Sequence, residues 1–350
     1  MAYLSIKNTT VKGIAVAVPQ HEESNEDYPF VSEKEKELFI KTTGIKKRRK
    51  AHSQLLASDL CYEAAEKIIE KLQWKKEEIE LLVYVSQSRD YIIPSTSILL
   101  QERLKLPKTC LCFDVPLGCS GYVYGLSIMA AFISHGQIKK GLLLAGDTSS
   151  FSVNPKDKST YPLFGDAGSA TAVEWCAEDM EMFFELGSDG AGAENIIIPG
   201  GHCKEPITSE SLTTQRIAPG IERNRVNLAL NGEEVFYFSV TQVPLSIKNL
   251  MSYCNQTVDE IDYWIMHQAN KIMNETIRIK TKVPKEKVPY SLENFGNTSS
   301  ASIPLTMVIH QNKEVFNNKK LLLSGFGVGL SWANLILKTK EIEILNLIEV

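Results

Sequence analysis

Residues 78–87 read EIELLVYVSQ, and residues 260–269, in the second half of the chain, read EIDYWIMHQA. Both stretches combine an acidic approach, an apolar run of strand length and a polar turn. A second pair, KKGLLLAG at residues 139–146 and KKLLLSG at residues 319–325, is separated by a similar distance, about half of the chain. We therefore predict a duplicated α/β unit.

The segments around these runs alternate between helical and strand-like patterns. Apolar residues at helical spacing predict helices, and short runs rich in β-formers predict strands. The expected helices cover residues 58–72, with Ser58 as N-cap, 95–104 and 120–133, and the expected strands cover residues 81–85, 109–115 and 141–145. Such alternation is typical of βαβ units in a mainly parallel sheet. We expect two halves of this kind, at residues 1–177 and 178–350.

The composition excludes several classes of protein. The 350 residues include 38 basic and 42 acidic side chains, a net charge of −4, whereas a general nucleic-acid binder is normally basic. No apolar run approaches the length of about 18 residues that a membrane span needs, and residues 1–7 lack a signal-peptide core. Seven cysteines, without a Cys-x-x-Cys pair or a Cys/His comb, indicate neither a disulfide framework nor a metal site. We expect a cytoplasmic protein that binds no nucleic acid and no metal.

One cysteine, Cys119, lies in the setting of a nucleophile. It follows a strand-like run, precedes an apolar helical pattern and is flanked by Gly118 and Gly121. The N-terminus of a helix carries a partial positive charge that lowers a thiol pKa and favours the reactive thiolate. The glycines permit a tight turn against a substrate. A buried structural cysteine is the alternative.

Two further residues have side chains suited to catalysis. His267 lies at the carboxyl end of an expected strand, where open α/β sheets place their sites. Asn297 belongs to a small polar stretch, residues 293–304, before an apolar helical pattern. Helix capping is the alternative role for both. The turn GFGVG at residues 325–329 is able to aim backbone N–H groups at an oxyanion.

Two other motifs have structural interpretations. The basic run at residues 46–50 predicts a solvated loop, with a docking patch for an acidic partner as the alternative. Asp166 lies in FGDAGSA, residues 164–170, and we expect it to serve turn formation and packing rather than catalysis.

Together, these motifs resemble those of a divergent member of the β-ketoacyl-acyl-carrier-protein synthase III family, in the thiolase superfamily. The motifs follow the family's order: TGI (43–45), DVPLGCSGY (114–122), LFGDAGSA (163–170), LGSDG (186–190), HQAN (267–270), FGNTS (295–299) and GFGVGLSW (325–332). The resemblance implies a thiolase-like α/β fold, with two pseudo-twofold-related βαβαβαββ halves in five layers. It also implies a homodimer with acyl carrier protein as a partner.

The resemblance implies a reaction as well. Cys119 would accept an acyl group from a thioester of coenzyme A or of acyl carrier protein, while the backbone N–H groups of Cys119 and Val328 hold the oxyanion. His267 and Asn297 would stabilise the enolate that forms when a malonyl thioester loses carbon dioxide. The product would be a β-ketoacyl thioester, and the thioesters are substrates rather than bound cofactors.

Several positions differ from the family's usual pattern. Leu38 and Thr42 stand where members that use acetyl-coenzyme A have Trp and Arg. Ile93 stands at the position that reaches across the dimer to limit acyl length, where Phe is common. These differences favour a primer other than acetyl and a donor on a carrier protein. The residues expected to dock the carrier or coenzyme A are Lys47, Arg48, Lys158, Lys271, Arg278 and Lys280.

Three alternatives remain open from the sequence. An acyltransferase of the same family would keep Cys119 but form an ester or an amide, although Asn297 favours carbon–carbon bond formation. A papain-like cysteine peptidase shares the order Cys, His, Asn but not the sequence around the cysteine. An inactive partner subunit conflicts with the intact set of three residues. The pathway stays open between fatty-acid biosynthesis and a specialised lipid, polyketide or polysaccharide pathway.

Overall fold

Two β-sheets dominate the structure, a computed structural model that describes residues 2–178 and 180–350. Their strands are β1 (Ala2–Lys7), β2 (Thr9–Val18), β5 (Leu81–Val85), β6 (Leu111–Val115), β7 (Lys140–Asp147), β8 (Ala167–Trp175), β9 (Glu181–Ser188), β14 (Tyr263–Met266), β15 (Lys320–Gly327), β16 (Ser331–Lys338), β17 (Glu343–Ile344) and β18 (Ile348–Glu349). The seven-stranded sheet has the order β17-β2-β8-β7-β5-β6, with β18 also paired to β2. The five-stranded sheet has the order β1-β9-β16-β15-β14.

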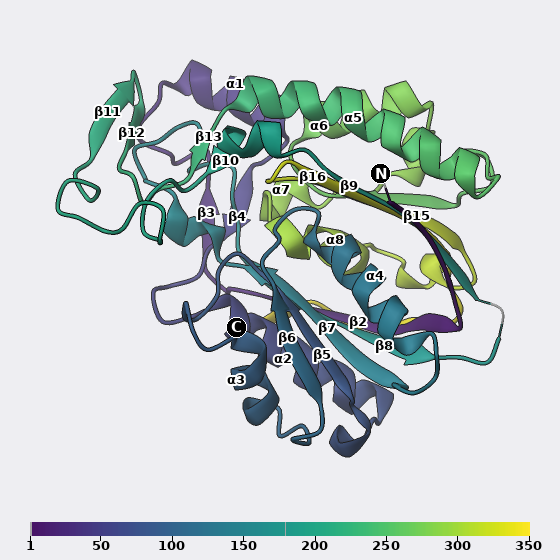
Figure 1. Cartoon of the computed structure of the whole chain (residues 1–350). Coiled ribbons are helices and arrows are strands. Elements are labelled where there is room, and N and C mark those ends of the chain that lie inside the picture. The colour runs from purple at the N-terminus through teal and green to yellow at the C-terminus, as the bar shows by residue number, and fades with distance from the viewer. Residues whose placement is uncertain (1, 179) are drawn as a thin grey trace.

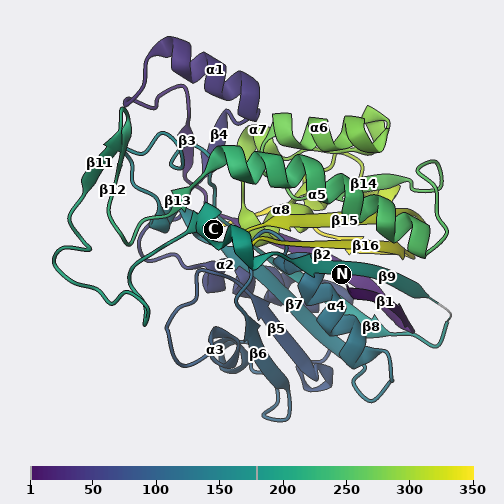
Figure 2. The same cartoon turned by 45° about the horizontal axis from the view of Figure 1, so that its top comes forward.

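The described ranges contain eight α-helices, most of which pack on the faces of the two sheets. They are α1 (Glu33–Thr43), α2 (Ala57–Leu72), α3 (Thr96–Arg103), α4 (Gly121–Ile133), α5 (Gly232–Tyr253), α6 (Lys271–Thr281), α7 (Leu292–Phe295) and α8 (Ser302–Val308). Helices α2 and α3 cover the outer face of the seven-stranded sheet, α4 and α8 lie between the sheets, and α5 and α6 cover the outer face of the five-stranded sheet (Figures 1 and 2). Of the other two helices, α1 contacts α6, and α7 contacts strand β4 (Lys47–Arg49). This arrangement confirms the predicted five-layered, thiolase-like fold.

The two sheets repeat one topology. In the first, β2 is antiparallel to β8, β8 is antiparallel to β7, and β7 is parallel to β5. Strands β9, β16, β15 and β14 follow the same order with the same directions. The paired sequence stretches form β5 with β14 and β7 with β15, so the predicted duplication is confirmed. In the described chain, β6 has no counterpart in the second half.

Each end of the chain contributes to the sheet that is formed mainly by the other half of the sequence. Strand β1 pairs with β9 of the five-stranded sheet, and β17 and β18 pair with β2 of the other. Neither sheet is therefore built from residues 1–177 or 178–350 alone. The packed interior between the sheets includes Val83 and Val85 of β5, Leu126 of α4 and Leu323 of β15.

The expected helices and strands of the first half form close to their predicted bounds, with two differences. Ser58 is not the N-cap of α2: the Asp59 carboxylate accepts the N–H of Leu56 at 2.8 Å, and the Ser58 hydroxyl donates to Asp90 instead. Strand β6 is shorter than predicted and is not buried, because it is the edge of its sheet and Leu111 is 42% exposed.

The basic run at residues 46–50 is not a solvated loop. It contains strand β4 (Lys47–Arg49), which pairs with β3 (Glu22–Ser24). Its five cations form ion pairs with Glu293, Glu22, Glu23, Glu349 and, again, Glu23. The acidic partners come from distant parts of the chain, so the local run of like charge gave a misleading prediction.

The remaining elements are short. Two further strand pairs are β10 (Ile196–Ile197) with β13 (Ala229–Leu230) and β11 (Gln215–Ala218) with β12 (Ile221–Arg223). The 3-10 turns are η1 (Lys76–Glu78), η2 (Ser149–Ser152), η3 (Gly190–Asn195), η4 (Lys285–Lys287), η5 (Ser299–Ala301) and η6 (Lys313–Phe316). Among the helices in the described ranges, none combines the length and apolarity that crossing a membrane requires.

Candidate active site

Cys119 lies in the loop between β6 and α4, directly before Ser120, the N-cap of that helix. The carbonyl of Gly118 accepts the N–H of Gly121 at 2.7 Å and closes a tight turn around the cysteine. A Cβ atom on Gly118 would overlap the amide oxygen of Gln87. Glycine at this position therefore leaves room for the Gln87 side chain beside the loop that carries Cys119.

His267 follows the last residue of β14 and is buried. Its backbone N–H donates to the carbonyl of Ser324 at 2.7 Å, which continues the pairing with β15. Its Nδ1 atom lies 2.8 Å from the hydroxyl of Ser302, the first residue of α8. The ring packs edge-on against Phe326, with 5.6 Å between centroids. These contacts, together with the backbone of Ser299, which also interacts with the imidazole, fix the ring at the wall of the pocket.

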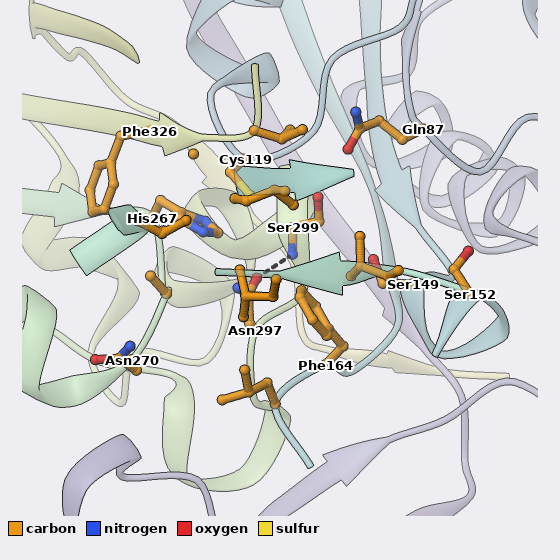
Figure 3. Close-up of a pocket in the computed structure, with 18 of the residues that line it drawn as sticks. Gln87, Cys119, Ser149, Ser152, Phe164, His267, Asn270, Asn297, Ser299 and Phe326 are labelled. Carbon is orange, nitrogen blue, oxygen red and sulfur yellow. Dashed lines mark hydrogen bonds between the residues drawn. The ribbon is translucent and has the colours of Figure 1, made fainter. Parts of the chain in front are cut away.

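Asn297 is held by backbone and side-chain bonds. Its N–H donates to Leu163, and its carbonyl accepts the N–H of Gly165. Its Oδ1 accepts the backbone N–H of Ser299 at 2.9 Å, the dashed line in Figure 3. Because the oxygen is engaged, the amide NH2 group is left as a donor to the pocket.

The glycine turn approaches the nucleophile closely. Gly327 has φ +155°, and a Cβ atom there would lie 2.7 Å from Cβ and 2.9 Å from Sγ of Cys119. The backbone N–H groups of Val328 and Cys119 both donate toward the sulfur. The Ser331 hydroxyl accepts from or donates to Ser120 at 2.7 Å and donates to the Val328 carbonyl at 2.8 Å. The turn and the start of α4 are thus tied together.

The three residues singled out from the sequence line one pocket (Figure 3). Cys119 comes from the loop after β6, His267 from the end of β14, and Asn297 from the loop before α8. The first half supplies the thiol and the second half supplies both neutral hydrogen-bond donors. The pocket therefore presents a thiol, a pair of backbone N–H groups and two neutral side chains that can donate hydrogen bonds to one ligand.

The electrostatics of the pocket differ from the expectation for the cysteine. Burial raises the pKa of the Cys119 thiol to about 11, although the N–H of Val328 and the Ser299 hydroxyl lower it in part. The prediction of a depressed pKa is wrong, because desolvation and the Asp147 carboxylate outweigh the hydrogen bonds that favour the thiolate. Burial also lowers the pKa of His267 to about 3, which keeps the imidazole neutral.

Comparisons with known proteins agree with this geometry. Two models of 3-oxoacyl-[acyl-carrier-protein] synthase III, its N-terminal part and its C-terminal part, match residues 113–190 and 251–339. A β-ketoacyl-[acyl-carrier-protein] synthase III of Rhodopirellula baltica is 31% identical and aligns with 95% of this chain and 99% of its own. The chain belongs to the synthase III family. This membership leaves no support for a papain-like peptidase.

Solved structures of the family superpose over the whole length. A 3-oxoacyl-(acyl-carrier protein) synthase from Burkholderia xenovorans is 34% identical, with a TM-score of 0.94 over 100% of this chain and 99% of that one. A synthase III from Thermus thermophilus is 27% identical, with a TM-score of 0.81 over 94% of this chain and 98% of that one. The backbone that carries the candidate residues of this chain is therefore folded as it is in these synthases.

Asp147, at the end of β7, is a residue that the sequence did not reveal. It is buried and accepts the N–H of Gln87 at 2.7 Å and the hydroxyls of Ser86 and Ser300 at 3.2 and 2.7 Å. It therefore joins the loop after β5 to the loop that carries Asn297. Burial raises its pKa. The one feature of the sequence that could have indicated Asp147 was its position at the carboxyl end of an expected strand.

The other sequence predictions have mixed outcomes. Arg48 is 1% exposed and donates to the carbonyl of Tyr161 at 2.6 Å and to Glu23 at 3.0 Å, so its assignment as a docking residue is wrong. Asp166 accepts from Ala51 and Ser150, which confirms its packing role.

The remaining docking candidates have varied surroundings. Lys47 and Lys271 are exposed. Lys158 pairs with Glu35 at 2.9 Å, Arg278 pairs with Glu275 at 2.8 Å, and Lys280 donates to the Val240 carbonyl at 2.8 Å. Across residues 2–178 and 180–350, no three His, Cys, Asp or Glu side chains are grouped as metal ligands would be.

Proposed function

We propose that this synthase III-type acyltransferase loads an acyl group onto Cys119 and then condenses it with a malonyl thioester. The observation that carries the proposal is the convergence of Cys119, His267 and Asn297 on one pocket, with the imidazole kept neutral. A neutral imidazole and an amide are the donors that an enolate oxygen needs. The donor of the malonyl group is expected to be malonyl-acyl-carrier protein.

In the first half-reaction, the sulfur of Cys119 attacks the carbonyl carbon of an acyl thioester and loses its proton. The oxyanion accepts hydrogen bonds from the backbone N–H groups of Cys119 and Val328. Collapse of this intermediate breaks the bond to the carrier sulfur. Coenzyme A or acyl carrier protein leaves as the thiol, and the acyl group stays on the enzyme.

In the second half-reaction, a malonyl thioester loses carbon dioxide, and the electron pair forms an enolate. His267 donates from Nε2 and Asn297 donates from its NH2 group to the enolate oxygen. The α-carbon then attacks the acyl carbonyl, a carbon–carbon bond forms, and the bond to Cys119 breaks. The sulfur regains a proton, and a β-ketoacyl thioester leaves. All atoms and electrons balance with thioesters as the substrates.

A homodimer fits the surface of the first half. Strand β6 is a sheet edge, and exposed apolar side chains cluster around it: Ile98, Leu111 and Phe132. Ile93 is 84% exposed and lies outside the pocket of its own chain, which supports its role as a gate in the partner's acyl pocket. Sedimentation analysis tests this: a monomer at micromolar concentration would contradict the dimer.

Acyl carrier protein is the proposed partner, with exposed Lys47 and Lys271 as docking residues, because the carrier is acidic and an exposed ammonium attracts it. Lys158, Arg278 and Lys280 would have to exchange their present partners to contribute. The seven cysteines are all free, which supports a reducing compartment and hence a cytoplasmic location. A role in fatty-acid biosynthesis follows from the family.

The decisive experiment is intact-mass analysis after incubation with a panel of acyl-coenzyme A and acyl-carrier-protein donors. We expect one acyl group per chain, and no loading of Cys119→Ala. Loading that persists in this variant would remove Cys119 as nucleophile. Malonyl-acyl-carrier protein is then added: carbon dioxide and a β-keto product support condensation. Transfer to a hydroxyl or an amine without carbon dioxide would support the ester- or amide-forming alternative.

A further inference from the structure

Three polar side chains that have no hydrogen-bond partner among the described residues line the pocket that contains Cys119. We infer that the acyl group loaded on Cys119 carries a hydroxyl substituent close to its thioester carbonyl, and that Gln87, Ser149 and Ser152 recognise it. The inference rests on the proposed function and names its substrate class. Figure 3 places these three residues on one side of Cys119, with His267 and Phe326 on the other.

Gln87 lies beside the loop that carries Cys119. It follows β5 by two residues, and its backbone N–H donates to Asp147 at 2.7 Å, which fixes the loop. Its side-chain oxygen lies directly against Gly118, the neighbour of Cys119 in the chain. Among the described residues, the amide of Gln87 has no hydrogen-bond partner, so it is free to donate to and accept from a ligand hydroxyl.

Ser149 and Ser152, both in η2, have hydroxyls that are equally uncommitted within the described chain. Their neighbours differ: the Ser150 hydroxyl donates to Asp166 at 2.6 Å, and the Ser88 hydroxyl is 3.5 Å from Asp147 and accepts the N–H of Thr148. Ser88 and Ser239 also line the pocket, but their hydroxyls are bonded inside the protein, that of Ser239 to the Val235 carbonyl at 2.8 Å. Ser149 and Ser152 therefore differ from these serines.

The pocket also has an apolar lining, which includes Leu163, Phe164, Ile196, Ile198, Leu228 and Leu230. Gln87 is exposed and the two serines are half-buried, so water reaches all three side chains in the free protein. An alkyl chain seated on them would remove this water without replacing its hydrogen bonds, which is costly. A site equipped to hydrogen-bond a substrate hydroxyl therefore discriminates against the analogue that lacks it.

The test is a competition between butyryl and 3-hydroxybutyryl thioesters at equal concentration, each offered on coenzyme A and on acyl carrier protein. The two loaded forms differ by one oxygen atom and are resolved by intact mass. We expect the hydroxyacyl group to load at least about tenfold faster. In Gln87→Leu, which keeps the size but not the amide, this preference should fall to within about twofold.

A matched control is Gln54→Leu, the same substitution at an exposed position outside the pocket, which should keep the preference. Ser152→Ala is a smaller change and should also reduce the preference for the hydroxyacyl group. It provides an independent test if circular dichroism shows that Gln87→Leu folds poorly. Equal loading of both groups by the unmodified protein would overturn the inference and leave the proposed function intact. So would a preference that survives both pocket variants. Failure of every donor to load Cys119 would overturn the proposed function itself.

Discussion

The hydroxyl oxygen of Ser302 lies 2.8 Å from Nδ1 of His267 and accepts the backbone N–H of Gln268 at 3.3 Å. We infer that this hydroxyl, which accepts the N–H of Gln268, donates its own proton to Nδ1. The neutral imidazole then carries its proton on Nε2. In this arrangement Ser302 is a positioning residue, because it selects the tautomer that can donate to an enolate.

We predict that Ser302→Ala slows condensation about tenfold, the effect of losing one hydrogen bond of about 1.4 kcal/mol, and leaves the acylation of Cys119 unchanged. Acylation is measured by the rate of mass increase and condensation by the release of carbon dioxide. Ser302→Thr keeps the hydroxyl and should retain condensation. An equal loss in both half-reactions would instead indicate a general packing defect.

The reactivity of Cys119 should rise with pH over an unusually wide range. The folded protein holds its thiol pKa near 11, so the thiolate fraction increases about tenfold per pH unit below that value. We expect the alkylation of Cys119 by iodoacetamide to follow this slope from pH 7 to pH 10, as measured by peptide mass analysis. The exposed Cys203 serves as an internal reference thiol. A plateau of the Cys119 rate above pH 7 would contradict the raised pKa.

The glycine turn lies so close to Cys119 that adding one methyl group at Gly327 should strongly reduce the rate of acylation. In Gly327→Ala, the new Cβ meets both Cβ and Sγ of Cys119 at less than 3.0 Å, in a backbone conformation that side chains rarely adopt. We expect acylation to fall at least about a hundredfold, as for the loss of an oxyanion donor. Gly190→Ala is the matched control, because its Cβ meets nothing within 4 Å. Similar acylation rates in the two variants would argue against the oxyanion role of the turn.

Arg48 and Lys47 are neighbours in sequence with opposite expected effects on stability. Arg48→Met removes the buried donor of the Tyr161 and Phe164 carbonyls, whereas Glu23 keeps Lys50 and the Tyr161 hydroxyl as partners. We expect the free energy of unfolding to fall by about 2 kcal/mol. Lys47→Met removes a half-exposed charge and should change it by less than about 0.5 kcal/mol. Urea unfolding compares them. If both substitutions changed the free energy of unfolding by similarly small amounts, the buried role of Arg48 would be contradicted.

Much of the fold was predictable because its information is local. The runs that form β5, β7, β14 and β15 are apolar stretches of strand length, and their repetition at half the chain length predicts the duplication. Cys119 was predictable for a related reason: a glycine-flanked cysteine between a strand and a helix is a pattern of adjacent residues. The resemblance to the synthase III family, which rests on seven motifs in the family's order, then grouped His267 and Asn297 with it.

The sequence by itself therefore determined the α/β class, the duplication and the three candidate catalytic residues, because spacing and local pattern are properties of neighbouring residues. Tertiary structure alone decided how these residues behave. The basic run became a set of ion pairs, the Cys119 pKa rose, and Asp147 came to join two loops. Gln87 was likewise revealed beside the nucleophile only by the fold. Desolvation and ion pairing depend on atoms contributed by distant segments, and a linear pattern does not record which segments meet.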